Sequence, residues 1–257
     1  MICGTLIPAC VIAYYGLTDR SGTFTMANII AIASGEHAKA LGLSLLLAFA
    51  STAICLLLAF PLGLALKDSK LGKKGFMVFV FILPMWMNFL LRTMAWQVLL
   101  EKNGIINGML TAVGLPSLNI INTSAAVILG MVYDYLPFMI LPIYNALIKI
   151  DNSLIEAAYD LGASKSLVLR KVIVPLSIPG IVSGVTMVFV PSLTTFAISN
   201  MLGGGKVNLI GNIIEQEFTA SSNWNLGSGL SLVMMIFIVI SMALIEKFDR
   251  NGEGNMI

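Results

Sequence analysis

Charged side chains are scarce in this sequence. Asp, Glu, Lys and Arg make up 11% of its 257 residues, whereas a soluble domain carries about 25%, so the composition argues against an ordinary soluble globule and against a disordered chain. Cysteine occurs three times without CxxC spacing, which excludes a disulfide framework and a cysteine metal site. The single histidine, His37, offers no cluster of ligands for a metal ion.

Motifs for catalysis and for ATP binding are also missing. The sequence has no HExxH and no GxSxG, and its glycine-rich segment LGGGKV, which ends at Val207, lacks the Ser or Thr hydroxyl with which a P-loop holds Mg²⁺. We therefore expect the chain not to be an enzyme and to hold no cofactor or metal of its own. Any ATP hydrolysis would come from a partner.

Long apolar runs take up most of the chain. Hydrophobic residues make up 58% of it, and the mean hydropathy is +0.93. Runs such as LLLAFASTAICLLLAF do not alternate polar and apolar residues as the strands of a membrane barrel do. We therefore expect the segments that cross the membrane to be helices. At about 20 residues per helix, the sequence predicts one all-α membrane domain over 1–257 with six spans, at about 1–17, 40–66, 76–100, 125–150, 176–198 and 226–245.

The basic residues predict which side faces the cytoplasm. Ten Lys and Arg residues lie between the second and third spans, between the fourth and fifth, and after the sixth, whereas four lie on the opposite side. Short cytoplasmic loops carry the excess of Lys and Arg. We therefore expect the side with ten basic residues, and both termini, to face the cytoplasm. The net charge of +2 gives no reason to expect nucleic acid.

One cytoplasmic segment, KIDNSLIEAAYDLGASKSLVLRKVIVPLSIPG from Lys149 to Gly180, is too polar to cross a membrane. Asp151 suits the N-cap of a short helix that Gly162 would end, and Ser164 suits the N-cap of a second helix ending near Pro175. Such a hairpin could receive another protein or lie at the membrane surface without a partner, and the residue pattern alone leaves both open.

The same segment resembles the EAA motif of the membrane permeases of ABC importers, written EAA-x3-G-x9-I-x-L-P. The matching residues are Glu156, Ala157, Ala158, Gly162 and Pro175, with Val172 and Val174 at the Ile and Leu positions. The resemblance implies a type I permease fold in which this loop, at about 151–175, couples to an ATPase. Glu156 would contact the ATPase, the two alanines would permit close approach, and Gly162 would form the bend.

Nearly the whole chain resembles the PotB-type family of spermidine/putrescine permeases. The matching segments are LPMWMNFLLRTMAWQVLLEKNGIIN, MVYDYLPFMILPIYNAL, VPLSIPGIVSG, FVPSLTTFAISNMLGGGK and NWNLGSGLSL. This implies a permease subunit that moves a small cation, a polyamine, by alternating access. A related ABC permease for another solute is the alternative. An ion-coupled secondary transporter is less favoured, because inverted repeats and intramembrane ion ligands are not evident.

The resemblance also implies partners and a location. A second, similar permease would complete the pathway, and two copies of a cytoplasmic ATPase would hold ATP and Mg²⁺. An extracytoplasmic binding protein would deliver the solute to the outer face. The complex would lie in the cytoplasmic membrane of a prokaryote. Glu215, Glu217 and Trp224, in the long outer segment at 200–225, are the candidate docking residues.

Two charged residues fall inside predicted spans. Arg92 and Asp134 lie eight and nine residues from the outer ends of the third and fourth spans, so both lie about 12–13 Å deep. Charges at that depth are costly unless paired, and we expect a salt bridge between them. The alternative is that Asp134 receives an ammonium group of the substrate. Tyr133 and Tyr135 are candidate residues of the pathway through cation–π contacts.

Overall fold

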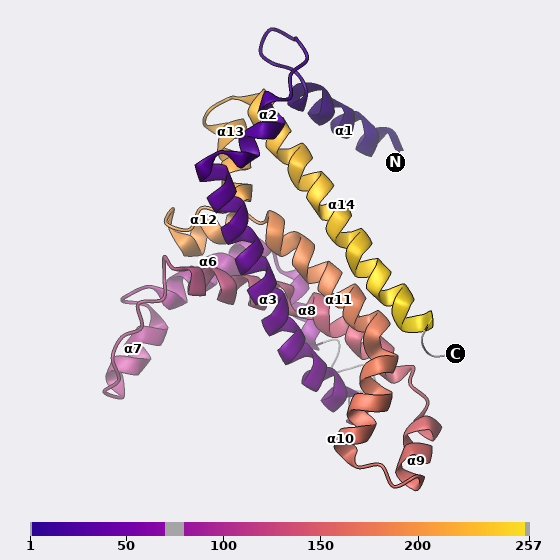
Figure 1. Cartoon of the computed structure of the whole chain (residues 1–257). Coiled ribbons are helices and arrows are strands. Elements are labelled where there is room, and N and C mark those ends of the chain that lie inside the picture. The colour runs from indigo at the N-terminus through magenta and orange to yellow at the C-terminus, as the bar shows by residue number, and fades with distance from the viewer. Residues whose placement is uncertain (1, 70–79, 255–257) are drawn as a thin grey trace.

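The structure is a computed structural model that describes residues 2–69 and 80–254. Within these ranges the regular elements are helices, joined by loops and accompanied by an isolated β-bridge between Thr18 and Phe24 (Figure 1). The helices are α1 (Ile2–Gly16), α2 (Ala27–Ile30), α3 (Gly35–Asp68), α6 (Phe89–Leu100), α7 (Ile105–Ala112), α8 (Ser124–Ile148), α9 (Asn152–Asp160), α10 (Lys165–Val168), α11 (Val174–Thr194), α12 (Ala197–Gly203), α13 (Ile210–Thr219) and α14 (Trp224–Gly254). Short 3₁₀ segments, η1 (Ala31–Ala33) and η2 (Leu83–Trp86), and a π-helical segment, η3 (Leu169–Ile173), complete them.

Three long helices, α3, α8 and α11, form the centre of the fold. Cys55 of α3, Ile143 of α8 and Val188 of α11 are fully buried in one apolar cluster. Glycines allow α11 to approach α8 closely: a Cβ atom at Gly180 would lie 2.6 Å from the Pro142 carbonyl oxygen. Because lipid tails are as apolar as leucine, membrane helices associate through this kind of close contact between small residues.

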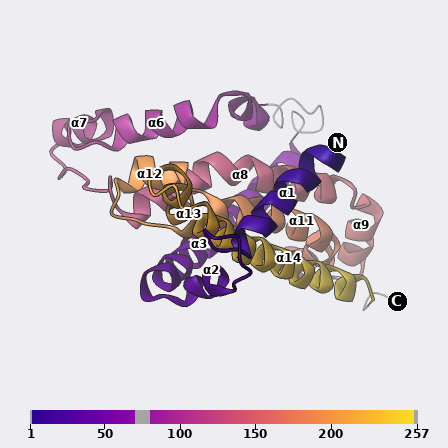
Figure 2. The ribbon, with the colours of Figure 1, turned by 90° about the horizontal axis from the view of Figure 1, so that it is seen from above.

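The remaining helices surround this centre. Figure 1 shows α9 and α10 at one end of the molecule and α2 and α13 toward the other. In Figure 2, α6 and α7 follow one edge of the molecule, and α14 lies on the opposite side. The short helices α12 and α13 are held by buried residues: Ile198 and Leu202 pack with α8, and Ile210 packs with α3 and α14.

Four helices in the described part of the chain are long and apolar enough to cross a membrane: Gly35–Asp68, Ser124–Ile148, Lys165–Thr194 and Trp224–Ile245. The predicted first span corresponds to the shorter α1. The predicted third span falls partly outside the described residues, and its described part breaks at Met87 and Asn88, where the Asn88 side chain accepts the Leu90 N–H and begins α6. The membrane-spanning helical fold is therefore present, whereas the count of six stays a prediction.

Two boundaries differ from the expected ones. The predicted fifth span, at about 176–198, ends as a helix at Thr194 and resumes as α12 after the extended Thr195. The helix predicted to end near Pro175 instead continues through it, so that prediction was wrong. The π-helical turn η3 ends at Ile173, two residues before Pro175. A proline ring clashes with the carbonyl four residues earlier, and the wider π turn relieves that clash.

Candidate functional site

The α9–α10 hairpin carries the residues that the EAA motif singled out. Asp151 is the N-cap of α9, as predicted, and its side chain accepts the Ser153 N–H at 3.0 Å. Hydrogen bonds from Ser153 hold the pKa of the Asp151 carboxyl below its ordinary value. Glu156 and Ala157 are exposed and Ala158 is half-buried, whereas Ile155 packs against the apolar centre of the fold. The helix is therefore anchored on one face and open on the other.

Gly162 forms the bend between the two helices. Its φ of +80° lies in the left-handed region, which glycine adopts without the strain of a Cβ atom. The Gly162 N–H bonds the Tyr159 carbonyl at 2.8 Å, and the Ala163 N–H bonds the Ala158 carbonyl at 3.0 Å. These two bonds make a Schellman motif. Ser164 then caps α10 by accepting the Leu167 N–H, as predicted.

The second helix of the hairpin is continuous with a membrane helix. Residues Lys165–Thr194 form one helical run, and within it Gly180 and Gly184 lie four residues apart against Pro142 and Met139 of α8. A force applied to the hairpin would therefore reach α11 without crossing a flexible loop. The sequence did not reveal this connection, because a proline usually signals a helix boundary.

Arg92 and Asp134 lie together between α6 and α8. Arg92 Nη2 is 3.3 Å from Asp134 Oδ1, and the two side chains are 6% and 2% exposed. The Thr93 hydroxyl lies 3.1 Å from Asp134 Oδ2 as a donor and is also within reach of the Phe89 carbonyl. Within the described part of the chain, Arg92 Nε and Nη1 are buried without a hydrogen-bond partner. The geometry is that of the expected ion pair, closed to solvent.

Tyr133 and Tyr135 have different surroundings. Tyr133 is 39% exposed, and its ring packs edge-on to Trp96 at 5.3 Å between centroids. Tyr135 is half-buried, and its hydroxyl donates to the Pro191 carbonyl of α11 at 3.5 Å. Successive residues of a helix are about 100° apart, so the structure does not bring the two rings to one pathway wall.

The three candidate docking residues also lie at different places on the structure. Glu217 lines a polar cavity of about 560 Å³ between α13 and the first turn of α3, together with Glu36 and Lys206. Glu215 lines a different, apolar groove described below. Trp224 is 55% exposed and packs against the ring of Phe218. The sequence could not show the α3 side of the polar cavity, because Glu36 lies far from Glu217 along the chain.

A buried polar network that the sequence did not reveal holds α12 and α13 in place. Asn212 accepts the Leu209 N–H at 2.9 Å and donates to the Phe196 carbonyl at 3.1 Å, and the Ser199 hydroxyl lies 2.7 Å from the Asn212 side-chain oxygen. Ser44 of α3 accepts the Ile210 N–H at 2.9 Å. A buried Asn inside an apolar stretch, as in LIGNII, is the signal that points to such a network.

No metal centre is evident in the described ranges: no group of three His, Cys, Asp or Glu residues there could hold an ion. The described geometry thus comprises an exposed helical hairpin joined to a long apolar helix, a buried ion pair, and two cavities beside α13, one polar and one apolar. Such an arrangement suits the transfer of movement from a partner to membrane helices.

Comparison with known protein families decides the assignment. Residues 58–251 match the family described as binding-protein-dependent transport system inner membrane component. The chain belongs to this family. Its members are the membrane components of ABC importers, and a separate subunit hydrolyses ATP, so the chain is a membrane-spanning permease subunit and not itself an enzyme.

Among curated relatives, the spermidine/putrescine transport system permease protein PotB of Haemophilus influenzae is 36% identical over 96% of this chain and 91% of its own length. PotB of Escherichia coli is 33% identical over 88% of this chain and 83% of its own. These relatives confirm the PotB-type resemblance seen in the sequence.

Solved structures show the same fold. A bacterial ABC transporter involved in alginate import superposes with a TM-score of 0.79 at 14% identity, covering 98% of this chain and 90% of that chain. A subunit of the MetNI methionine ABC transporter gives a TM-score of 0.61 at 20% identity, covering 84% and 95%. The type I permease fold expected from the EAA motif is therefore confirmed.

Proposed function

We propose that this chain is the permease subunit of an ATP-driven importer for spermidine or putrescine. The observation that carries the proposal is the identity to PotB of 33–36% over most of the chain. The family match disfavours the ion-coupled transporter. A permease for another solute is the remaining alternative, since the inner membrane ABC transporter permease protein YdcU of Escherichia coli is also 32% identical, over 87% of this chain.

The α9–α10 hairpin is the proposed coupling site. Its exposed Glu156 and Ala157 would contact the cytoplasmic ATPase, with Ala158 permitting close approach, Gly162 setting the bend and Pro175 within the continuous helix. Closure of the ATPase dimer would then move α11 against α8. ATP and Mg²⁺ would be bound by that partner, present in two copies beside a second, similar permease.

Co-purification of the ATPase with the permease tests the coupling site. We expect Glu156→Ala to weaken both ATPase retention and ATP-driven uptake, and the matched control Asp160→Ala, an exposed carboxylate on the same helix, to leave both unchanged. Equal behaviour of the two variants would contradict the assignment.

Two glycines with the same φ angle provide a test of the bend at Gly162. Gly162 and Gly114 both have φ of +80° and open space around the Cβ position, so an alanine at either imposes about 1–2 kcal/mol of left-handed strain. Only Gly162→Ala should weaken ATPase retention. A similar loss with Gly114→Ala would mean that strain anywhere in the chain has this effect.

The proposed orientation places the hairpin and both termini in the cytoplasm of a prokaryotic cell. In this proposal α1 and residues 76–100 are the two further spans that bring the total to six. The excess of basic residues on the hairpin side supports it. A reporter protein fused to the C-terminus would be active only if cytoplasmic. An extracytoplasmic reporter signal there would contradict this orientation.

The polar cavity with Glu36 and Glu217 is the proposed contact surface for the extracytoplasmic binding protein, with the exposed Trp224 as a separate candidate contact. It lies at the end of α3 opposite the hairpin, where a delivered solute would enter (Figure 1). Arg92 and Asp134 are proposed to join α6 to α8. In this conformation the Asp134 carboxylate is too buried to receive a substrate ammonium group.

A further inference from the structure

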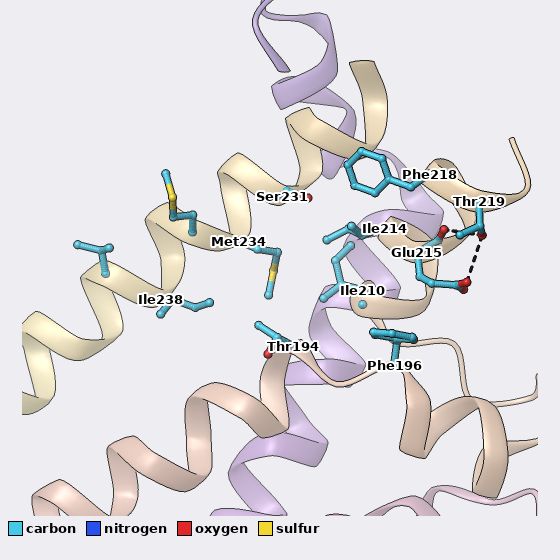
Figure 3. Close-up of a pocket in the computed structure, with 13 residues that line it drawn as sticks. Thr194, Phe196, Ile210, Ile214, Glu215, Phe218, Thr219, Ser231, Met234 and Ile238 are labelled. Atoms are coloured by element: carbon cyan, nitrogen blue, oxygen red, sulfur yellow. Dashed lines mark hydrogen bonds between the residues drawn. The ribbon is translucent and has the colours of Figure 1, made fainter. Parts of the chain in front are cut away.

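An apolar groove with a volume of about 530 Å³ lies between α13, α14 and the end of α11. Figure 3 shows Ile210 and Ile214 of α13 pointing toward Met234 and Ile238 of α14 across it, with Thr194 at its base. None of the functions proposed above uses this groove.

The groove lies at the depth of the hydrocarbon core. The span in α14 begins at Trp224, and the lining residues Ser231 and Val239 follow it by seven and fifteen residues. At 1.5 Å per residue they lie about 10 and 22 Å along the helix, inside a core about 30 Å thick. Water does not reach this depth, so an apolar partner must fill the groove.

The mouth of the groove continues into the surface that faces lipid. Met235 and Val239, at the mouth, are 49% and 60% exposed, and the neighbouring Ile236 and Ile240 are 52% and 53% exposed. An acyl chain can therefore pass from the surrounding bilayer into the groove without crossing a polar barrier. The flexible thioethers of Met234 and Met235 can adjust to such a chain.

The length and lining of the groove suit an acyl chain. The groove follows α14 from Ser231 to Val239, about 12 Å, and its lining is almost entirely apolar. A single hydrocarbon chain is thin enough to enter and restores the dispersion contacts that an empty groove would lose.

One edge of the groove carries a charge. Glu215 is the one ionisable residue among those that line it in the described structure, and its carboxylate accepts a hydrogen bond from Thr219 at 3.1 Å (Figure 3). Glu215 lies one turn from Phe218, whose ring rests against Gly227 near the start of α14. This is the end nearer the membrane surface, where a lipid headgroup lies.

We propose that this groove binds one acyl chain of a phospholipid with an amine headgroup, held near the Glu215 carboxylate. The proposal rests on the membrane function and orientation proposed above. It adds a structural lipid to α13 and α14, the helices next to the outer cavity.

Photolabelling of the complete transporter in nanodiscs tests the groove. The probe is a phosphatidylethanolamine with a diazirine on one acyl chain, and labelled residues are mapped by mass spectrometry. We expect label on Ile214, Met234 and Ile238. Val239→Trp, which fills the mouth, should reduce it about tenfold, whereas the matched control Ile240→Trp, outside the groove, should leave it unchanged. Uniform label around α14, or equal effects of the two variants, would overturn the proposal.

The headgroup is tested with the same probe built on phosphatidylglycerol. The wild type should prefer the phosphatidylethanolamine probe about fivefold. Glu215→Gln should abolish that preference, and Glu217→Gln, which lies in the other cavity, should keep it. A cross-link from a photoreactive residue at 235 to another protein subunit would overturn the lipid in favour of a protein helix.

ATP hydrolysis stimulated by spermidine or putrescine together with the extracytoplasmic binding protein, measured in the same nanodiscs, separates this inference from the proposed function. Stimulated hydrolysis without specific labelling overturns the lipid site alone. Specific labelling without stimulation supports the lipid site and contradicts the polyamine assignment.

Discussion

Removal of either member of the Arg92–Asp134 pair should destabilise the chain more than removal of both. At 3.3 Å and an effective dielectric constant of about 20, the attraction between the two charges is about 5 kcal/mol. Desolvation of two side chains that are 6% and 2% exposed offsets most of it. The pair therefore contributes little net stability, whereas a lone buried charge costs about 3–5 kcal/mol.

We expect Asp134→Leu and Arg92→Leu each to lower the free energy of unfolding by about 3–5 kcal/mol, and the double variant to recover to within about 2 kcal/mol of the wild type. The assay is unfolding of the purified chain in mixed micelles titrated with SDS. Phe138→Leu, at a 36% exposed site one turn further along α8, is the control, with an expected change under about 1 kcal/mol. The pairing argument would be refuted if the two single-variant changes in unfolding free energy simply added in the double variant. It would also be refuted if each single change were as small as that of the control.

Other predictions concern packing and caps. Gly180→Ala should lower stability in the SDS titration by about 1–3 kcal/mol, because its Cβ would lie 2.6 Å from the Pro142 oxygen. Gly42→Ala, at a helical glycine with open space around it, should be neutral or stabilising in the same titration. Asn212→Leu leaves the Leu209 N–H without its acceptor and removes the donor to the Asn200 side-chain oxygen, and it should cost about 2–4 kcal/mol in the SDS titration. Asn225→Leu, at a half-buried site, should cost less. The pKa of Asp151 is lowered by hydrogen bonds from Ser153, so its charged cap is present at neutral pH and lost as the pH falls through that lowered pKa. Amide exchange in α9, corrected for intrinsic rates, should rise there in the wild type, and an unchanged profile in Asp151→Ala at neutral pH would contradict the cap.

Local features of the α9–α10 hairpin were predictable from the sequence. Asp151, Gly162 and Ser164 act through neighbours within three or four residues, and their chemistry determines where α9 ends and α10 begins. The Arg92–Asp134 pair was predictable as well, because two charges at the same depth of adjacent spans have few other partners.

Contacts between distant segments were not predictable in this way. The bond from Ile210 to Ser44 joins residues 166 positions apart, and nothing in either segment alone requires it. The helix that continues through Pro175 depends on a π turn that local propensity disfavours. Glu215 and Glu217 lie two residues apart on α13 and therefore on different faces of it, but the cavity that each face lines is formed with α3 or α14, which neither residue's own segment shows.

ATP-driven uptake in proteoliposomes tests the central claim most directly. The liposomes would hold this chain with its second permease and ATPase, and the extracytoplasmic binding protein would be supplied outside with radiolabelled spermidine or putrescine. The account predicts uptake that requires ATP and the binding protein and that falls with Glu156→Ala but not with Asp160→Ala. Uptake of another solute in place of polyamines, or polyamine uptake driven by an ion gradient without ATP, would contradict it.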